Sequence, residues 1–266
     1  MPELSFLAFA GNPCAAYANE NPVLEDIAWS ELHVSEVLGE GASGIISRGT
    51  WTSPSASSQS AETQVAIKLF KGEVTSDGSP ADEMSACIAA GKHANLINPL
   101  GKIHGHPEKK GLVLELIPPS YTNLGQPPNL DTCTRDTYPP ETQLQPSKVL
   151  EILRGIASAA AHLHGQGISH GDLYAHNILL GSDGHALLGD FGAATVYKGC
   201  GYEARLERVE VLAFAHLVED MLGLMVVGEE GKDVRRVGRE IWRAASNASV
   251  EGRPSFTEIV DMLMAI

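Results

Sequence analysis

The chain has 266 residues, of which 43% are hydrophobic, and 19 basic against 33 acidic residues give it a net charge of -14. This length and apolar content suit one large globular domain or two small ones that share a core. The acidic balance lacks the positive footprint that nucleic acid or an anionic membrane requires. We therefore expect neither nucleic acid nor a membrane among its partners.

Cysteine spacing and apolar run lengths bear on the cellular compartment. The four cysteines form no CxxC pair and lie far apart, which predicts neither a disulfide framework nor a zinc site. No apolar run is long enough to cross a bilayer, and residues 5–11 lack the basic flank of a signal peptide. These features predict a soluble protein in the reducing cytoplasm.

Residues 1–30 are expected to be an N-terminal extension. They contain an alternating apolar stretch at 4–14 that closes in Gly-Asn-Pro and resembles the last unit of a leucine-rich-repeat array. Because one unit cannot bury its own apolar face, the stretch indicates either an upstream leucine-rich-repeat region or a surviving cap. A plain strand packed on the main domain is the alternative.

Residues 31–117 are expected to form a small sheet with one helix. The stretch at 81–96, rich in alanine, favours a helix that ends at Gly91. A Ser-rich stretch at 52–63 is typical of an exposed hairpin loop. Short apolar segments predict strands at 33–41, 44–51, 63–70 and 111–117.

Residues 118–266 are expected to be mainly helical. The segment 118–146 is rich in Pro, Thr and Asn, which predicts a long connecting or cover loop. Ser147 is expected to cap a helix with an apolar stripe, and His162 and His164 are expected on the surface of that helix. Further helices are predicted at 205–226, 234–246 and 255–266.

The first half contains two features typical of phosphate binding. The segment GEGASG, from Gly39 to Gly44, matches GxGxxG, but an apolar strand follows it where a dinucleotide site would need a helix. Lys68 ends VAIK on a predicted strand, and Glu83 lies on the next helix. Considered alone, Lys68 and Glu83 are each typical of surface residues. If Glu83 faces Lys68, it would hold the ammonium over a nucleotide's phosphates.

The second half contains two polar segments beside short apolar strands. In HGDLYAHN, one loop can point Asp172 at an attacking hydroxyl and Asn177 at a cation, as phosphoryl transfer requires. In LLGDFGAA, the carboxylate of Asp190 is suited to bridge Mg²⁺ to phosphate oxygens. Either segment alone could be an ordinary turn. Three such motifs in this order coincide by chance in far fewer than about one in 10⁴ chains.

Together, these motifs resemble the signature of the protein kinase family: a Gly-rich loop, VAIK, HGDLYAHN and DFG. The resemblance covers residues 34–266 and is closest to compact bacterial or plant-type kinase domains linked to leucine-rich repeats. It implies an α+β fold of two lobes. The N-lobe, 31–117, would be small and rich in β-strands with one helix, and the C-lobe, 118–266, larger and mainly helical with a shortened activation segment.

The resemblance also implies the chemistry. The chain would be an ATP-dependent phosphotransferase that uses Mg²⁺, most simply a protein kinase acting on a hydroxyl of a protein substrate. His170 and Phe191 would stack between the lobes alongside Cys87. The implied catalytic residues are Asp172, Lys68, Glu83, Asn177 and Asp190, with Asn177 and Asp190 as the metal ligands. The implied ATP-binding residues are Leu38, Gly39, Gly41, Gly44, Ile46, Ala66, Lys68, Leu114, Glu115, Ile117 and Leu179.

Several positions depart from the family pattern. Gly171 replaces the arginine that usually precedes the catalytic aspartate, so a phosphorylated activation loop has no arginine there to dock on. The Ala-Pro-Glu motif is absent, and Glu210 stands where the anchor helix has an aspartate. Arg253, in the closing GRPSF, therefore lacks its usual partner, and Glu203 or Glu207 is the expected substitute.

Two other functions remain open from the residues. Small-molecule kinases of the aminoglycoside phosphotransferase type also carry HGDL and also lack the peptide platform. A pseudokinase scaffold would explain the broken activation segment. The Gly-rich loop, VAIK, the helix glutamate and GRPSF favour a protein kinase. Tyr174 and His176 in the catalytic loop indicate no preference for Ser, Thr or Tyr as the acceptor.

Overall fold

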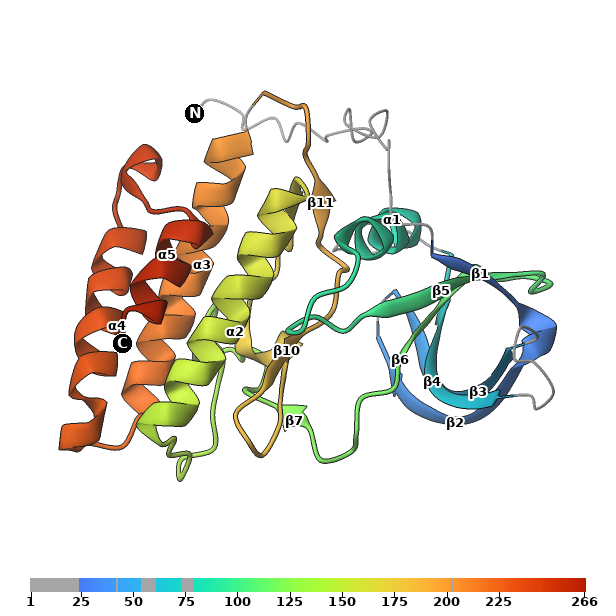
Figure 1. Ribbon diagram of the computed structural model, residues 1–266, viewed down its shortest axis with the longest axis horizontal. Helices are drawn as coiled ribbons and strands as arrows, with labels where there is room; N and C mark the ends of the chain where they lie inside the picture. The colour runs from blue at the N-terminus through green and yellow to red at the C-terminus, as the bar shows by residue number, and fades with distance from the viewer. Residues whose placement is uncertain (1–23, 42, 54–60, 73–78, 202) are drawn as a thin grey trace.

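The computed structural model describes residues 24–41, 43–53, 61–72, 79–201 and 203–266 (Figure 1). The stretch that resembles a leucine-rich repeat and most of the Ser-rich loop lie outside the described residues. Within the described residues, no helix is both long enough and apolar enough to cross a membrane.

The first half is a six-stranded sheet in the order β1-β5-β6-β4-β3-β2. Its pairs are antiparallel except β1 with β5, which are parallel. β1 lies within the stretch assigned to the N-terminal extension and adds an edge strand to the sheet. The strands are β1 (Glu25–Ala28), β2 (Leu32–Glu40), β3 (Gly44–Ser53), β4 (Ala61–Phe70), β5 (Pro99–His104) and β6 (Gly111–Glu115).

Alternation along β4 sends its residues to two different cores. Val65 and Ile67 pack with Ile27 and Val113 in a small apolar cluster on one face of the sheet. Ala66 and the other residues of even number point to the opposite face, because successive side chains of a strand alternate. That face meets the rest of the molecule and carries Lys68.

Helix α1 (Pro80–Ala90) packs between the sheet and the helical half (Figure 1). The side chain of Ser79 accepts a hydrogen bond from the backbone N–H of Ala81, which caps the start of the helix. Gly91 follows the last helical residue with φ of 65°. Because glycine adopts this left-handed conformation without strain, the predicted end of the helix at Gly91 is confirmed.

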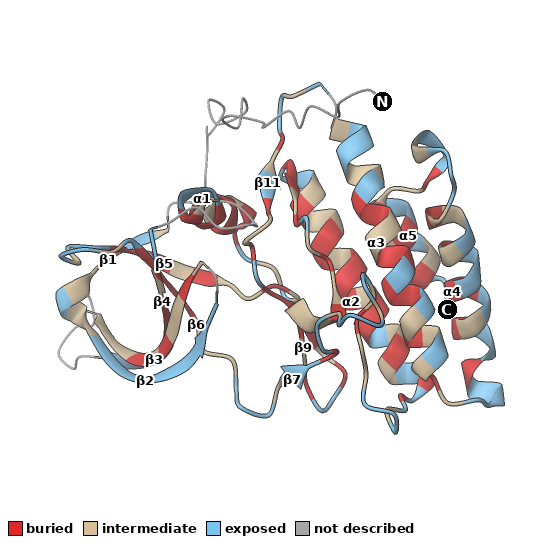
Figure 2. Ribbon diagram, turned by 180° about the vertical axis from the view of Figure 1, so that it is seen from behind, coloured by how far each residue is buried: buried red, intermediate tan, exposed pale blue. Residues whose placement is uncertain are grey.

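The second half consists of helices with their apolar faces turned inward (Figure 2). Val149, Ile152, Leu153 and Ile156 lie at helical spacing and are fully buried. The predicted cap at Ser147 is wrong: α2 begins at Pro146, because proline suits a first helical position that needs no N–H donor. The helices are α2 (Pro146–Gly165), α3 (Glu203–Leu224), α4 (Lys232–Ala245) and α5 (Phe256–Met264).

Short strands carry the segments between α2 and α3. β7 (Thr122–Asn123), β9 (Ile178–Leu180) and β10 (Ala186–Leu188) form a three-stranded sheet, and β8 (Ile168–Ser169) pairs with β11 (Thr195–Val196). A sheet-rich first half and a helical second half confirm the expected α+β fold class. Cys87 and Cys133 are free thiols. Cys200 is disulfide-bonded, so the expectation of no disulfide is wrong at this residue.

A stacked histidine pair joins the end of α1 to α2 and predicts a pH dependence of stability. His93 lies 5.0 Å from His162, centroid to centroid, and its Nδ1 accepts the backbone N–H of Asn95. Burial, with the charge of His162, lowers the pKa of His93 below its usual 6.5. The unfolded chain therefore gains a proton first as the pH falls, so stability should be full above 6.5 and decline below it.

Melting temperatures measured from about pH 7.5 to pH 5 test this expectation. The decline should be smaller in His93→Gln, which cannot take up a proton. His33, an exposed histidine, supplies the control variant His33→Gln, which should keep the wild-type slope. Equal slopes in wild type and His93→Gln would contradict the assignment.

Candidate active site

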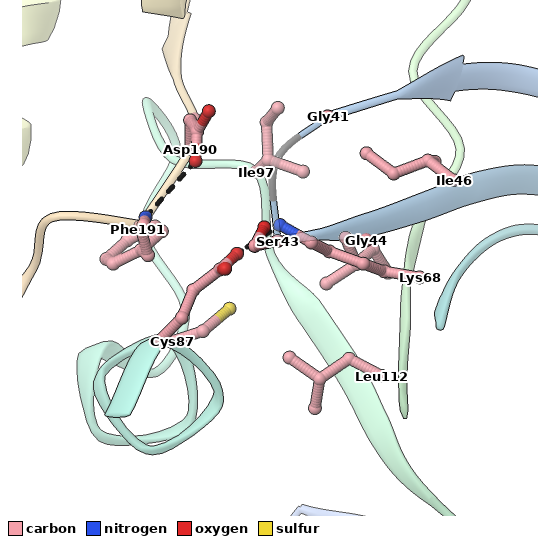
Figure 3. A pocket seen from close by; sticks show the side chains of 14 residues that line it. Gly41, Ser43, Gly44, Ile46, Lys68, Cys87, Ile97, Leu112, Asp190 and Phe191 are labelled. Carbon is pink, nitrogen blue, oxygen red and sulfur yellow. Dashed lines mark hydrogen bonds and ion pairs between the residues drawn. The ribbon is translucent and has the colours of Figure 1, made fainter. Parts of the chain in front are cut away.

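A cavity of about 180 Å³ lies between the sheet and the helical half (Figure 3). Its walls combine glycines of the β2–β3 turn, apolar side chains and the charged groups of Lys68, Glu83 and Asp190. The lining residues are Gly41, Ser43, Gly44, Ile46, Lys68, Glu83, Cys87, Ile97, Leu112, Leu114, Gly189, Asp190, Phe191 and Gly192. The cavity thus unites the Gly-rich loop, VAIK, the helix glutamate and the Asp-Phe-Gly segment.

Lys68 and Glu83 form a buried ion pair in the cavity wall (Figure 3). Lys68 is 8% exposed and Glu83 is 4% exposed. Two charges withdrawn from water in this way are held only because each neutralises the other. The second carboxylate oxygen of Glu83, Oε2, has no hydrogen-bond partner among the described residues. Glu83 therefore faces Lys68, as the predicted role of this pair in phosphate binding requires.

Gly44 must be a glycine because the chain turns tightly against β4. A Cβ atom there would lie 2.6 Å from the carbonyl oxygen of Leu69. The absence of a side chain lets β3 approach β4 and places Ile46 opposite Lys68 in the register. The turn therefore runs close over the mouth of the cavity.

Backbone pairing brings the catalytic-loop motif and the Asp-Phe-Gly motif together. Asn177 directly precedes β9 and Asp190 follows β10, and these two strands are antiparallel neighbours. The backbone N–H of Gly189 donates to the carbonyl oxygen of Asn177 at 3.0 Å. The side-chain Nδ2 of Asn177 donates to Oδ2 of Asp172 at 2.7 Å. Two carboxylates and one amide are therefore held at one end of a hairpin.

The backbone of Asp190 is strained. Its φ is 57°, a left-handed value that residues other than glycine seldom adopt, and its Oδ1 accepts the N–H of Gly192 at 3.1 Å. Such strain persists only where surrounding contacts enforce it, and it concentrates at functional sites. Asp190 lines the cavity, and its carboxylate is bonded back to the segment that follows it (Figure 3).

His170 and Phe191 are in contact at the cavity wall, but their ring planes are tilted by 54°, so the expected stacking is wrong. The ring centroids lie 5.3 Å apart, and Nε2 of the fully buried His170 bonds to the carbonyl oxygen of Gly189 at 2.8 Å. Cys87 lines the same cavity, and burial raises the pKa of its thiol to about 12. Cys87 therefore remains an uncharged packing residue in the arrangement that the resemblance implied.

Glu210 on α3 fixes the start of the catalytic loop. Its Oε1 accepts the backbone N–H of Gly171 at 2.7 Å, and its Oε2 bonds with Nε2 of His164 at 2.7 Å. Burial alone would raise the pKa of Glu210, but the hydrogen bond and charge of His164 hold it below its usual range. The predicted surface position of His164 is wrong, because α3 packs over that side of α2.

The prediction that Glu203 or Glu207 pairs with Arg253 is also wrong. Arg253 is 8% exposed and donates to the carbonyl oxygens of Asn247 at 2.9 Å and Arg208 at 3.0 Å. Glu207 instead accepts from the hydroxyl of Tyr197, and Glu203 accepts the N–H of Gly199. Backbone carbonyls therefore satisfy the guanidinium in place of a carboxylate.

The cavity contains some but not all of the residues that the resemblance implied. Among the implied ATP-binding residues, five line it: Gly41, Gly44, Ile46, Lys68 and Leu114. The cavity lining does not include Leu38, Gly39, Ala66, Glu115, Ile117 or Leu179, nor the catalytic-loop residues Asp172 and Asn177. The carboxylate of Glu115 bonds with the backbone N–H of Asn98 at 2.9 Å.

Sequence reasoning missed five lining residues. Ser43 lies within the Gly-rich loop, Gly189 directly precedes Asp190, and Gly192 is the last residue of Asp-Phe-Gly, so counting every residue in and next to these motifs would have found them. Leu112 occupies the predicted last strand without any motif of its own. Ile97 lies in a connection where the sequence contains no signal, and only the tertiary structure brings it to the cavity.

Comparison with known proteins gives the family. The model for protein tyrosine and serine/threonine kinases matches residues 32–212, which is more than half of the chain. The chain therefore belongs to the protein tyrosine and serine/threonine kinase family, and the α+β fold described above is that of a protein kinase domain.

Individual relatives carry kinase names of several kinds. A protein of Dictyostelium discoideum named as a probable serine/threonine-protein kinase is 26% identical over 66% of this chain and 11% of its own length. A non-receptor tyrosine-protein kinase of Homo sapiens is 30% identical over 59% of this chain and 22% of its own. A probable L-type lectin-domain containing receptor kinase of Arabidopsis thaliana is 28% identical over 65% and 24%. The matched region is less than a third of each relative.

Proposed function

We propose that this chain is an active protein kinase domain that transfers the γ-phosphoryl group of MgATP to a hydroxyl of a protein substrate. The observation that carries the proposal is the buried ion pair of Lys68 and Glu83 in the same cavity as Asp190. A buried pair seldom improves stability over apolar residues of similar volume. Its presence is therefore better explained by an anionic ligand than by the needs of the fold.

The donor set is compatible with MgATP. Apolar side chains such as Ile46, Leu112 and Leu114 offer a surface for a flat base, and Lys68 offers a cation for phosphate oxygens. The described residues contain no cluster of three or more His, Cys, Asp or Glu side chains suited to hold a metal alone. Mg²⁺ is typically held by one or two carboxylates together with substrate phosphates, which matches Asp190 and Asn177.

The chain's own residues would then act by positioning and charge. When bound, MgATP supplies the phosphoryl group and the divalent charge that offsets it. Glu83 would keep the ammonium of Lys68 directed at the inner phosphates. Nδ2 of Asn177 donates a hydrogen bond to Asp172, so the amide oxygen of Asn177 remains available to bind the cation. Asp172 would orient the acceptor hydroxyl and accept its proton.

The names of the relatives favour a protein substrate over a small molecule, since two of the three relatives are named as protein kinases. They include serine/threonine and tyrosine types, so the acceptor residue is left to the experiment. An upstream leucine-rich-repeat region and a cytoplasmic location remain proposals that rest on the sequence.

The test is γ-phosphate transfer by wild type and Asp190→Ala into the chain itself, generic proteins and a panel of small-molecule hydroxyls. We expect label in protein, at Ser, Thr or Tyr, at a rate at least about 10²-fold lower in the variant. Asp183→Ala is the control, since Asp183 is an exposed residue of the β9–β10 turn. Label confined to small molecules would favour the phosphotransferase alternative. Nucleotide binding without transfer would favour the scaffold.

A further inference from the structure

The loop between the two halves is fastened to α3 on both sides of Asp136. Arg135 forms ion pairs with Glu219, at 2.8 Å, and with Asp220. The hydroxyl of Tyr138 donates to the second oxygen of Asp220 at 3.2 Å. Burial raises the pKa of Tyr138, so its hydroxyl keeps the proton that this bond requires. Asp136 and Thr137, which lie between these two anchors, are therefore held in place.

Asp136 presents its carboxylate to the catalytic loop. Its side chain is 2% exposed. Its Oδ2 accepts the backbone N–H of His176 at 3.0 Å, and its Oδ1 lies 2.8 Å from Nδ1 of the same residue. Because an ionised carboxylate only accepts, the ring must donate through Nδ1. Two bonds from one buried carboxylate fix both the backbone and the ring of His176.

Other groups of the loop restrict His176 further. The side-chain Nδ2 of Asn123 donates to the carbonyl oxygen of His176 at 2.5 Å. The ring of Tyr174 stacks on the imidazole, with centroids 5.5 Å apart and planes at 26°. The imidazole therefore has little freedom to rotate away from Asp136.

This arrangement leaves Nε2 of His176 facing the catalytic carboxylate. Nε2 lies 3.9 Å from Oδ2 of Asp172, the same oxygen that accepts from Asn177. A carboxylate bonded to Nδ1 of an imidazole sets its tautomer and the direction of Nε2. The chain of contacts thus runs from α3 through Asp136 and His176 to Asp172.

We propose that Asp136 and His176 are positioning residues that hold the Asp172 carboxylate in the orientation required by the acceptor hydroxyl. This inference rests on the proposed kinase function. Neither residue lines the cavity, so their effect should fall on kcat while the KM for MgATP is preserved. The long loop at 118–146 thereby becomes part of the catalytic apparatus, although none of the family motifs lies in it.

The test measures kcat and KM for Asp136→Asn, His176→Asn and the double variant, with Asp131→Asn as the control. Asp131 lies in the same loop but is exposed. We expect each single variant to lose about 10-fold or more in kcat, because small displacements of reacting groups cost this much. The KM for MgATP should stay within about twofold. The double variant should lose no more than the worse single variant, as expected for residues that act as a unit.

A conservative replacement separates positioning from folding. His176→Arg places an N–H donor beside Asp172 and is expected to retain most of kcat, whereas His176→Phe is not. Wild-type kcat in both single variants would overturn the proposal, as would fully additive losses. A rise in KM at unchanged kcat would also overturn it.

The ring nitrogens of His176 provide a readout that needs no activity. ¹⁵N NMR of the imidazole should show shifts in both Asp136→Asn and Asp172→Asn and none in Asp131→Asn. If the wild type transfers no phosphate at all, the proposed kinase function fails. The NMR measurement still tests the contacts of His176 with Asp136 and Asp172. If Asp172→Asn leaves the ¹⁵N shifts of the His176 ring unchanged, the inferred link between His176 and Asp172 is overturned.

Discussion

Lys68→Ala should lower the rate of phosphoryl transfer by about 10²-fold or more, which corresponds to roughly 3 kcal/mol of transition-state stabilisation. The ammonium of Lys68 is the cation in the cavity lining, so its loss leaves the phosphate oxygens without their protein counter-charge. The remaining cavity walls are still able to bind the base, so nucleotide binding should weaken less than transfer. Single-turnover transfer and nucleotide titration on the same sample measure the two effects separately.

Folding has to be monitored in this variant, because removing Lys68 leaves Glu83 buried without its partner. Lys68→Ala combined with Glu83→Ala removes both charges and should recover stability without recovering transfer. Lys102→Ala, at an exposed position of β5, is the matched control and should match wild type in both respects. Unchanged transfer by Lys68→Ala would refute the site.

Gly171→Arg, which restores the residue usual for the family, should destabilise this chain by about 3 kcal/mol or more. Gly171 has φ of 78°, and a Cβ atom there would lie 2.4 Å from the carbonyl oxygen of Ala193. The backbone of Gly171 is also held in place, since its N–H is bonded to the buried carboxylate of Glu210. The chain has therefore settled on a loop conformation that excludes the family's arginine.

Denaturant midpoints of Gly171→Ala and Gly171→Arg measure this effect, and the alanine variant isolates the cost of the Cβ atom. Gly165→Ala is the control, because nothing lies within 4 Å of a Cβ atom at that helical position. Its stability should equal or slightly exceed that of wild type. A stable, active Gly171→Arg would show that the loop can adopt the usual family conformation.

Local patterns were sufficient for the main elements. The short apolar segment at 63–70 indicated strand β4, and the period near 3.6 in α2 marked its buried stripe. Gly91 ended α1 as predicted because the conformation it adopts is a local property of glycine. The motifs identified the ion pair and the Asp-Phe-Gly wall of the cavity, since their spacing along the chain is tied to the fold.

The sequence by itself determined those properties that depend on a few neighbouring residues: periodicity, caps, turns and motif spacing. The tertiary structure decided every pairing between distant segments, including His164 with Glu210, Arg253 with two backbone carbonyls, and Asp136 with His176. The physical reason is that a polar side chain bonds to whichever complementary group the packing brings within about 3 Å. Its own neighbours in the chain contain no information about which distant group that will be.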